Sequence, residues 1–480
     1  MDDVALIAVP LAGALLSFAI PSERARPFVL PVTGAAHLGL TLNAIASPAP
    51  SLGVASAWLS LDPLGGLVLA LVSALFFLCA LYAPAYLRVR EDRPNRILCL
   101  CLHFFLAMAS LVALSQHLGL LWVAVEGTTL ATAPLLYFNK NARSIEATWK
   151  YLVVGSVGIA LALLGSLFLA YALHLAGGET SLVFSSMIAG AKGMSAPWLR
   201  VAFVFLLVGY GTKMGLAPLH TWKPDAYGEA PGMVGALLAG GMSSAVFLAL
   251  LRVYAIVGAA GEGPFARELL IGMGFISIGL AAVFLVRQQD FKRMLAYSSV
   301  EQMGILVLGV GLGGAGVWAA LLHTLNNGLA KAVLFLSAAN IHRAFGSKSI
   351  SAVTGARRVL PWSSGLFLAG LFAVTGSPPF GPFVSSFAIL RRALSEGRYV
   401  VAALFLILLG AVFVGMGATV LAVVQGSPRE GAVTIRQRDS FWNVLPIAVA
   451  LGLLLMLGVW IPAPLSALLD RAAAMVEVAR

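Results

Sequence analysis

The chain has 480 residues, of which 60% are hydrophobic and only 11% are charged, and its formal net charge is +11. Soluble domains are roughly a quarter charged, so this composition excludes a water-soluble protein and predicts a polytopic membrane protein. The positive charge does not indicate nucleic-acid binding, because it is scattered through the loops and no basic domain carries it.

Apolar runs recur from one end of the chain to the other, and each is long enough to predict a helix that crosses a bilayer. The first run follows two acidic residues, which indicates a retained span rather than a cleaved signal peptide. No polar stretch is long enough to form a soluble domain. The fourteen runs cover residues 4–20, 28–47, 63–85, 98–114, 117–138, 148–173, 198–222, 231–255, 268–286, 294–312, 315–341, 360–391, 400–424 and 441–461.

Basic residues are concentrated in the odd-numbered loops between these runs. By the positive-inside rule, this alternation predicts that the odd loops face the cytoplasm and that both termini lie on the outer side. The segment 391–398 is the one exception, with three arginines on the predicted outer side. The odd loops contain Arg24, Arg26, Arg88, Arg90, Arg93, Arg96, Lys140, Arg143, Lys223, Arg287, Lys292, Arg293, Arg343, Lys348, Arg357, Arg358, Arg429, Arg436 and Arg438.

The fifth run carries Glu126 about nine residues into its helix, or roughly 14 Å deep. An isolated carboxylate at that depth takes up a proton unless a cation lies against it. Lys213, in the seventh run, is the natural partner. The alternative is a neutral glutamic acid hydrogen-bonded to Thr128 or Thr129.

The seventh run has Lys213 where the membrane is deepest, and Gly215 and Pro218 interrupt it just beyond. A charge in the bilayer centre costs about a few kcal/mol, so such residues face a bundle interior and mark ion or proton pathways. Broken helices beside a buried charge are typical of transporters. The alternative is that Lys213 snorkels from a helix end to the surface.

Four polar residues follow this interruption. His220, Trp222, Asp225 and Glu229 are expected to fix the turn rather than to move protons.

The tenth run contains Glu301, nearer to its cytoplasmic end. Two interpretations stay open from the sequence: Glu301 gives protons access to the interior, or it pairs with Lys292 or Arg293.

The eleventh run contains His323, Asn327 and Lys331 at four-residue steps, so the three side chains share one helix face. A polar stripe is unfavourable against lipid, so we expect it to face the bundle and a water chain. His323 alone is also compatible with a packing role.

The twelfth run is interrupted at Pro378 and Pro379, five spans after the break at Gly215 and Pro218. Paired interruptions at corresponding positions indicate inverted repeats with the site between them. Within a single transmembrane domain, we expect helices 1–3 at 4–97, a first repeat at 98–257, a second at 268–424, and a last helix at 441–461.

No cofactor motif, phosphate-binding loop or nucleophile arrangement is recognisable, so a stand-alone enzyme is not indicated. Cys79, Cys99 and Cys101 have no metal-ligand spacing and are expected to pack as small apolar residues. We therefore expect neither a metal nor a cofactor in this chain.

Several segments resemble one known family across roughly residues 60 to 420. It comprises the antiporter-like membrane subunits of respiratory complex I, Mrp-type cation/proton antiporters and group 4 membrane-bound NiFe hydrogenases, and the F-type subunit of hydrogenase-4 is most similar. The segments are GYGTKMGLAPLHTWKPDAYGEAP, WKYLVVGSVGIALALLG, DFKRMLAYSSVEQMGILVLG, NNGLAKAVLFL and TGSPPFGPF.

The resemblance implies fourteen core helices, two inverted five-helix repeats and a chain of protonatable residues along the membrane midplane. Glu126 matches the glutamate of the family's fifth helix, Lys213 the lysine of its seventh, and Lys331 the central lysine of its eleventh.

Three positions depart from the family pattern. Ser244 lies where many members have a lysine, Asn327 where many have a histidine, and Ser386 where glutamate or lysine usually ends the path. Because serine relays a proton only through water and holds no charge, the outward link from Lys331 is weakened.

The leading hypothesis is therefore proton translocation in a bacterial or archaeal cytoplasmic membrane, driven by redox chemistry in partner subunits. The expected partners are other membrane subunits and peripheral redox subunits of hydrogenase or complex I type, together with the lipid bilayer. The alternatives are a membrane anchor that does not pump, and sodium/proton exchange or coupling to inorganic carbon uptake.

Overall fold

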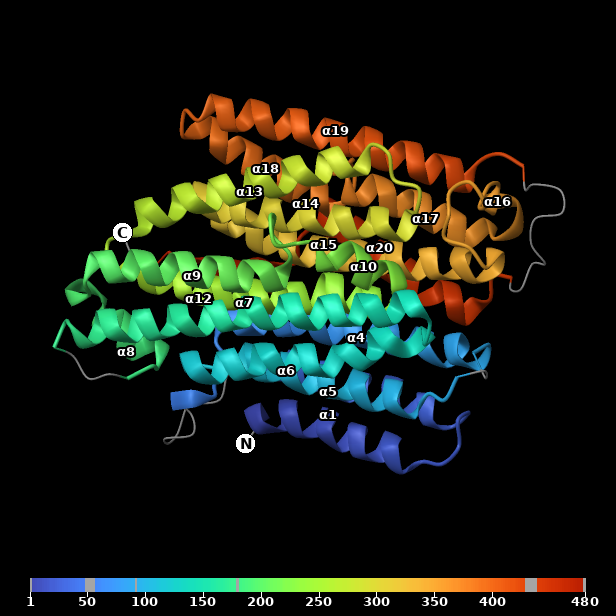
Figure 1. Cartoon of the computed structure of the whole chain (residues 1–480), viewed down its shortest axis with the longest axis horizontal. Coiled ribbons are helices and arrows are strands. Elements are labelled where there is room, and N and C mark those ends of the chain that lie inside the picture. Colours follow the sequence, from blue (N-terminus) through green and yellow to red (C-terminus); the bar gives the residue numbers. More distant parts are fainter. Residues whose placement is uncertain (1, 48–56, 91–92, 178–180, 428–437, 478–480) are drawn as a thin grey trace.

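A computed structural model describes residues 2–47, 57–90, 93–177, 181–427 and 438–477, and it shows helices lying side by side (Figure 1). The described residues form no strand beyond three isolated bridges. The helices are α1 (Asp2–Ala19), α2 (Val29–Ala46), α4 (Pro63–Arg88), α5 (Arg96–Leu114), α6 (Leu118–Leu136), α7 (Ala142–His174), α8 (Phe184–Ala189), α9 (Ala196–Met214), α10 (Trp222–Glu229), α11 (Gly232–Ala236), the π-helical η4 (Leu237–Met242), α12 (Ser243–Ala259), α13 (Gly263–Leu285), α14 (Phe291–Leu312), α15 (Ala315–Phe345), α16 (Ala356–Val359), α17 (Pro361–Val374), α18 (Gly381–Ser395), α19 (Tyr399–Val424), α20 (Phe441–Val459) and α21 (Ala463–Val476).

Each predicted apolar run is helical in the structure. The runs at 198–222 and 360–391 are divided at their breaks, into α9 and α10 and into α17 and α18. Within the described ranges, eleven helices are long and apolar enough to cross a membrane. The expectation of an all-α polytopic membrane protein is therefore confirmed.

The sequence did not predict the short helices α8 and α16 or the last helix, α21. The apolar side of α21 is buried and packs against α4 and α15.

Local signals fix where several helices begin and end. The Asp62 carboxylate accepts a hydrogen bond from the Gly65 amide at the start of α4, and Asn141 forms a reciprocal cap with Ser144 at the start of α7. Asp290 accepts from the first amides of α14. Such side chains satisfy amides that have no partner within the helix.

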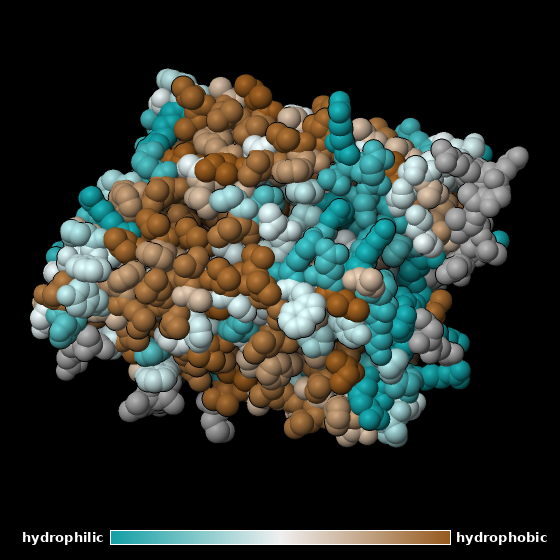
Figure 2. Space-filling view, viewed as in Figure 1, coloured by the Kyte–Doolittle hydropathy of each residue, from teal (hydrophilic) through white to brown (hydrophobic). Residues whose placement is uncertain are grey.

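The helices form a buried centre and an apolar exterior. The segment α11–η4–α12 and helix α15 are buried along their apolar lengths, whereas α7, α13 and α19 are less than half buried. Figure 2 shows a broad apolar surface over the left and centre of this face. An apolar surface of this kind indicates contact with lipid. Exposed apolar side chains of these three helices include Val153, Val157 and Leu167 of α7, Val283 of α13, and Val400, Ile407 and Val414 of α19.

Hydrophilic residues gather toward the right-hand end of the bundle, where α16 lies (Figures 1 and 2). The two marked chain ends lie toward the opposite end. This arrangement agrees with basic odd-numbered loops on one side and both termini on the other. Arg429 and Arg436, which contributed to that pattern, lie outside the described residues.

Two basic residues from the predicted loops are not free surface charges, because one is buried and the other is paired. Lys223, which was assigned to a loop, is in fact fully buried in the first turn of α10. The chain folds back into the bundle after the break in α9, so the lysine is enclosed. In the exceptional segment 391–398, Arg398 pairs with Glu268 at 2.6 Å, which partly neutralises that loop.

Helices α7 and α9 cross at close range because two glycines face each other. A Cβ atom at Gly209 would lie 2.5 Å from the Ala162 backbone nitrogen and 2.7 Å from the Gly158 carbonyl oxygen. Backbone atoms cannot move aside as a flexible side chain can. The crossing therefore holds α9, which carries Lys213, at a fixed distance from α7.

We expect Gly209→Ala to destabilise the protein by about 1–3 kcal/mol through overpacking, although alanine is the better helix former. Gly279→Ala is the matched control, because nothing lies within 4 Å of a Cβ atom at Gly279. Thermal unfolding in detergent measures both. Equal melting temperatures for the two variants would contradict the close crossing.

Candidate functional site

The break between α9 and α10 is closed by local hydrogen bonds. Gly215 ends α9 with φ at +81°, a left-handed conformation that favours glycine. The Ala217–Pro218 peptide bond is cis. His220 Nδ1 lies 3.2 Å from the Pro218 carbonyl oxygen, and the Trp222 indole donates to the Thr212 carbonyl at 2.9 Å. His220 and Trp222 thus contact the turn itself, as expected from the sequence.

The acidic residues of α10 attach this helix to its neighbours. Asp225 forms ion pairs with Lys150 at 2.9 Å and with Arg293. Glu229 pairs with Lys348 at 2.6 Å. Ion pairs to α7, to α14 and to the segment after α15 hold the helix in place.

The predicted pairing of Glu126 with Lys213 is present. The Lys213 ammonium lies 3.7 Å from a Glu126 carboxylate oxygen, and Lys213 is fully buried, so it does not snorkel to the surface. Thr129 donates to the same carboxylate oxygen at 3.1 Å, whereas Thr128 donates to a backbone carbonyl. The Tyr151 ring lies 5.4 Å from the Lys213 nitrogen. Glu126 therefore has both of the partners that the sequence left open.

A second cluster surrounds Lys331, which is fully buried in α15. Its ammonium donates to the Ser298 hydroxyl at 2.8 Å, and that hydroxyl lies 3.5 Å from a Glu301 carboxylate oxygen. Lys292 donates instead to the backbone carbonyls of Gly228 and Ala230 at the end of α10, and Arg293 pairs with an aspartate of α10. Glu301 therefore belongs to the Lys331 cluster, and the alternative of pairing with Lys292 or Arg293 is not observed.

Lys223 is a third buried lysine that the sequence did not predict. Its ammonium donates to the Met214 carbonyl at 2.5 Å and to the Ser299 hydroxyl at 3.2 Å. Met214 follows Lys213 in α9, and Ser299 follows Ser298 in α14. Lys223 thus joins the backbone beside the first lysine to the serine pair beside the third. A signal was present in the sequence, because Lys223 directly follows a tryptophan at the end of an apolar run.

The polar stripe on α15 faces the bundle interior as predicted. The two His323 ring nitrogens lie 2.8 Å from the Ser385 hydroxyl and 2.8 Å from the Gln302 side-chain oxygen. Asn327 is fully buried, and neither polar atom of its side chain has a hydrogen-bond partner. Ser386 is half-buried, and the serine that contacts His323 is its neighbour, Ser385.

The remaining predicted features are Ser244 and the helix break at Pro378 and Pro379. Ser244 follows the π-helical turn η4, and its hydroxyl donates to the Gly240 carbonyl at 2.5 Å, so its proton is used within its own helix. The break between α17 and α18 contains the cis peptide bond Pro378–Pro379. After this break, Gly381 lies directly against the Asn326 side chain of α15. The second break thus packs against the polar helix that carries Lys331.

Comparison with known proteins gives a consistent result. The family model described as NADH:quinone oxidoreductase/Mrp antiporter, TM, matches residues 115–413, a range that includes Glu126, Lys213 and Lys331. The chain is 33% identical to a hydrogenase-4 component F homolog of Methylacidiphilum infernorum, covering 84% of this chain and 85% of that protein. It is 34% identical to the NADH-quinone oxidoreductase subunit N of Desulforudis audaxviator, covering 78% and 74%.

Among solved structures, a chain of the membrane-bound sulfane sulfur reductase, an archaeal respiratory membrane complex, has a similar fold. The TM-score is 0.87 at 22% identity, and the match covers 99% of this chain and 97% of that chain.

The hydrogen bonds of α15 predict opposite responses at two neighbouring positions. His323→Leu removes the partner of Gln302, and an unsatisfied buried group costs about 1–3 kcal/mol, so the variant should be less stable. Asn327→Leu replaces polar atoms without partners and should leave the stability unchanged or raise it. Thermal unfolding of both variants measures the difference. A larger loss for Asn327→Leu would contradict these contacts.

Proposed function

We propose that this chain, which belongs to the NADH:quinone oxidoreductase/Mrp antiporter family, moves protons across a bacterial or archaeal cytoplasmic membrane. It is an antiporter-like membrane subunit, and redox chemistry in partner subunits would drive the transfer. The names of its relatives support this assignment, since one is a hydrogenase-4 component and another a subunit of NADH-quinone oxidoreductase. The observation that carries the proposal is a set of three buried lysines on broken or central helices.

The proposed membrane architecture has fourteen spanning helices, with both termini on the outer side. Helices 1–3 at 4–97 precede two inverted five-helix repeats at 98–257 and 268–424, and the last helix lies at 441–461. One proline-containing break in each proposed repeat supports this arrangement, as does the basic end of the bundle.

Proton transfer in the Lys331 cluster follows from its contacts. The Lys331 ammonium gives a proton to the Ser298 hydroxyl oxygen while the serine's own proton passes to the Glu301 carboxylate. Lysine becomes neutral, the glutamate becomes neutral, and the serine is regenerated. The reverse sequence recharges both groups, so one proton moves within the pair while its total number of protons and its net charge stay the same.

The Glu126–Lys213 pair would act as the electrostatic control. Opening this pair exposes the other buried lysines to an unbalanced positive charge and lowers their affinity for protons. A thousandfold change in affinity corresponds to about 4 kcal/mol. Moving one charge against 150 to 200 mV costs about 3.5 to 4.6 kcal/mol, so the two energies match.

Lys223 would supply the link that Ser244 cannot. The Ser244 hydroxyl donates within its own helix, whereas the Lys223 ammonium contacts both the end of α9 and the Ser299 hydroxyl of α14. A titratable group at this position can hold a proton between the two clusters. In the proposed path, Lys223 therefore takes the part of the eighth-helix lysine found in many similar proteins.

A second candidate function is a membrane anchor that does not pump. The groups that follow Lys331 at the outward end of the path favour this anchor function, because they hold no charge. They include the Asn327 side chain, which has no hydrogen-bond partner among the described residues, and the Ser385 hydroxyl. Sodium/proton exchange and coupling to inorganic carbon uptake are further alternatives. Turnover in sodium-free vesicles separates proton transfer from sodium exchange.

Replacing Glu126 by Gln or Lys213 by Met should reduce proton transport at least tenfold, because the control pair is lost. Redox turnover of the partner subunits with artificial acceptors should persist. The measurement is acidification of liposomes that contain the purified complex. Lys192→Met, at an exposed lysine, is the control. Normal transport in both variants would refute the role of the pair, and no transport by the wild type would favour the anchor.

Lys223→Met should also lower proton transport at least tenfold while the complex remains assembled. Lys223→Arg keeps a charge but holds its proton permanently, so it should not restore transport. Assembly and melting temperature are recorded beside transport, which distinguishes a relay from a structural role. Wild-type transport by Lys223→Met would remove Lys223 from the path and leave the proposed function standing.

A further inference from the structure

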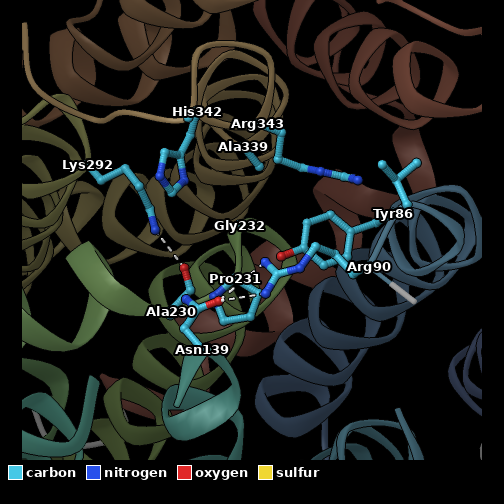
Figure 3. Close-up of a pocket in the computed structure, with 12 residues that line it drawn as sticks. Tyr86, Arg90, Asn139, Ala230, Pro231, Gly232, Lys292, Ala339, His342 and Arg343 are labelled. Atoms are coloured by element: carbon cyan, nitrogen blue, oxygen red, sulfur yellow. Dashed lines mark hydrogen bonds between the residues drawn. The ribbon is translucent and has the colours of Figure 1, made fainter. Parts of the chain in front are cut away.

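A cavity of about 370 Å³ lies between the ends of α4, α14 and α15 and the segment that follows α10 (Figure 3). The lysines of the clusters described above are not among its lining residues, which come from five parts of the chain. Figure 3 shows Lys292, His342, Arg343 and Arg90 around it. Asn139 and Tyr86 complete its polar lining.

The charge of the cavity wall is positive. Arg90, Lys292 and Arg343 line the cavity, and among the described residues that line it there is no aspartate or glutamate. The nearby carboxylates of Glu229 and Asp290 are engaged by Lys348, at 2.6 and 3.4 Å. Three cations therefore line one cavity.

Arg343 is the most informative of these residues. Both terminal nitrogens of its guanidinium are buried, and neither has a hydrogen-bond partner among the described residues. The Tyr86 ring lies 4.5 Å from the guanidinium carbon and holds the group in place. A buried guanidinium with unused donors is unfavourable unless an anion meets it.

The other polar groups are arranged to leave room for such an anion. Lys292 donates to the carbonyls of Gly228 and Ala230, at 2.9 and 2.6 Å, so its charge is held at one wall. Arg90 is held at another wall by the Asn139 side-chain oxygen, at 3.4 and 3.5 Å. The two charges are thus fixed on different sides of the cavity (Figure 3).

We infer that this cavity binds a phosphate group at the basic end of the bundle. Arginine presents paired donors that fit phosphate oxygens, and a phosphate carries more charge than a single carboxylate to balance three cations. The volume is at the lower end of the range for small-molecule sites, so the phosphate can carry a small substituent. A collection of cations repels protons, so the cavity does not suit proton uptake.

Two sources supply this chemistry, namely the headgroup of an anionic phospholipid and a phosphate compound from the aqueous phase. Either ligand would join α4, α14 and α15 through one anion. Binding should therefore stabilise the protein against unfolding in proportion to its occupancy. This inference does not depend on proton transfer.

The first test uses inorganic phosphate and the delipidated complex in detergent, with chloride as the reference salt at constant ionic strength. Phosphate should bind the wild type and raise its melting temperature. Arg343→Gln and Arg90→Gln should each weaken phosphate binding at least tenfold. Arg358→Gln, at an exposed arginine of α16, should bind like the wild type. Equal phosphate binding by all four proteins would overturn the inference.

The second test identifies the source by native mass spectrometry with phosphatidylglycerol and, as a control, phosphatidylcholine. Selective retention of phosphatidylglycerol by the wild type and its loss in Arg343→Gln indicate a lipid headgroup. Retention that is the same in both proteins, together with variant-sensitive phosphate binding, indicates a water-borne phosphate. If Arg343→Gln fails to assemble, Arg90→Gln and Arg343→Lys take its place. A carboxylate of a partner subunit cross-linked within the cavity would overturn the inference.

Discussion

The structure depends on one constraint, that a lysine ammonium buried among membrane helices must be met by a group of the protein. Lys213, Lys223 and Lys331 satisfy it with a carboxylate, a backbone carbonyl and a hydroxyl, respectively. The break after α9 provides the backbone carbonyl for Lys223, because a helix that ends leaves carbonyl oxygens without amide partners. The Met214 carbonyl is such a group, and the chain then returns to deliver Lys223 to it. The interruption thus creates a buried acceptor and places the lysine that uses it.

These three partners differ in what they allow. A carboxylate opposite a lysine holds the charge strongly, and removing one member of a buried pair costs about 3–5 kcal/mol. A hydroxyl such as that of Ser298 both donates and accepts, so it passes a proton onward and holds no charge itself. In the proposed mechanism, the first pair would therefore store electrostatic energy, while the Lys331 cluster would exchange protons. The Glu126–Lys213 pair lies on α6 and α9, and the Lys331 cluster lies on α14 and α15. In the proposed mechanism, a change in the pair would therefore act on the cluster through charge alone.

Much of this arrangement could be predicted from the sequence, and the misses have physical reasons. Apolar runs predict helices because a membrane leaves no other way to satisfy the backbone. The Glu126–Lys213 pair follows from the cost of an isolated charge deep in a membrane, and the polar face of α15 follows from helix periodicity. Lys223 was missed because polar residues surround it in the sequence, although the chain turns inward there. Ser386 was singled out because of the family resemblance, whereas the serine whose hydroxyl contacts His323 is Ser385, a contact that the resemblance does not indicate.

The distribution of charge also limits where protons can enter. The basic end of the bundle carries Arg90, Lys292 and Arg343 around a single cavity, and their field opposes an approaching proton. In the Glu126–Lys213 pair, the glutamate side chain is 20% exposed, whereas the lysine side chain is fully buried. A carboxylate attracts protons and a neighbouring cation alike. In the proposed path, protons would therefore reach Glu126 more readily than they would pass the basic cavity, and the proposed anion site and proton path would use different parts of the same fold.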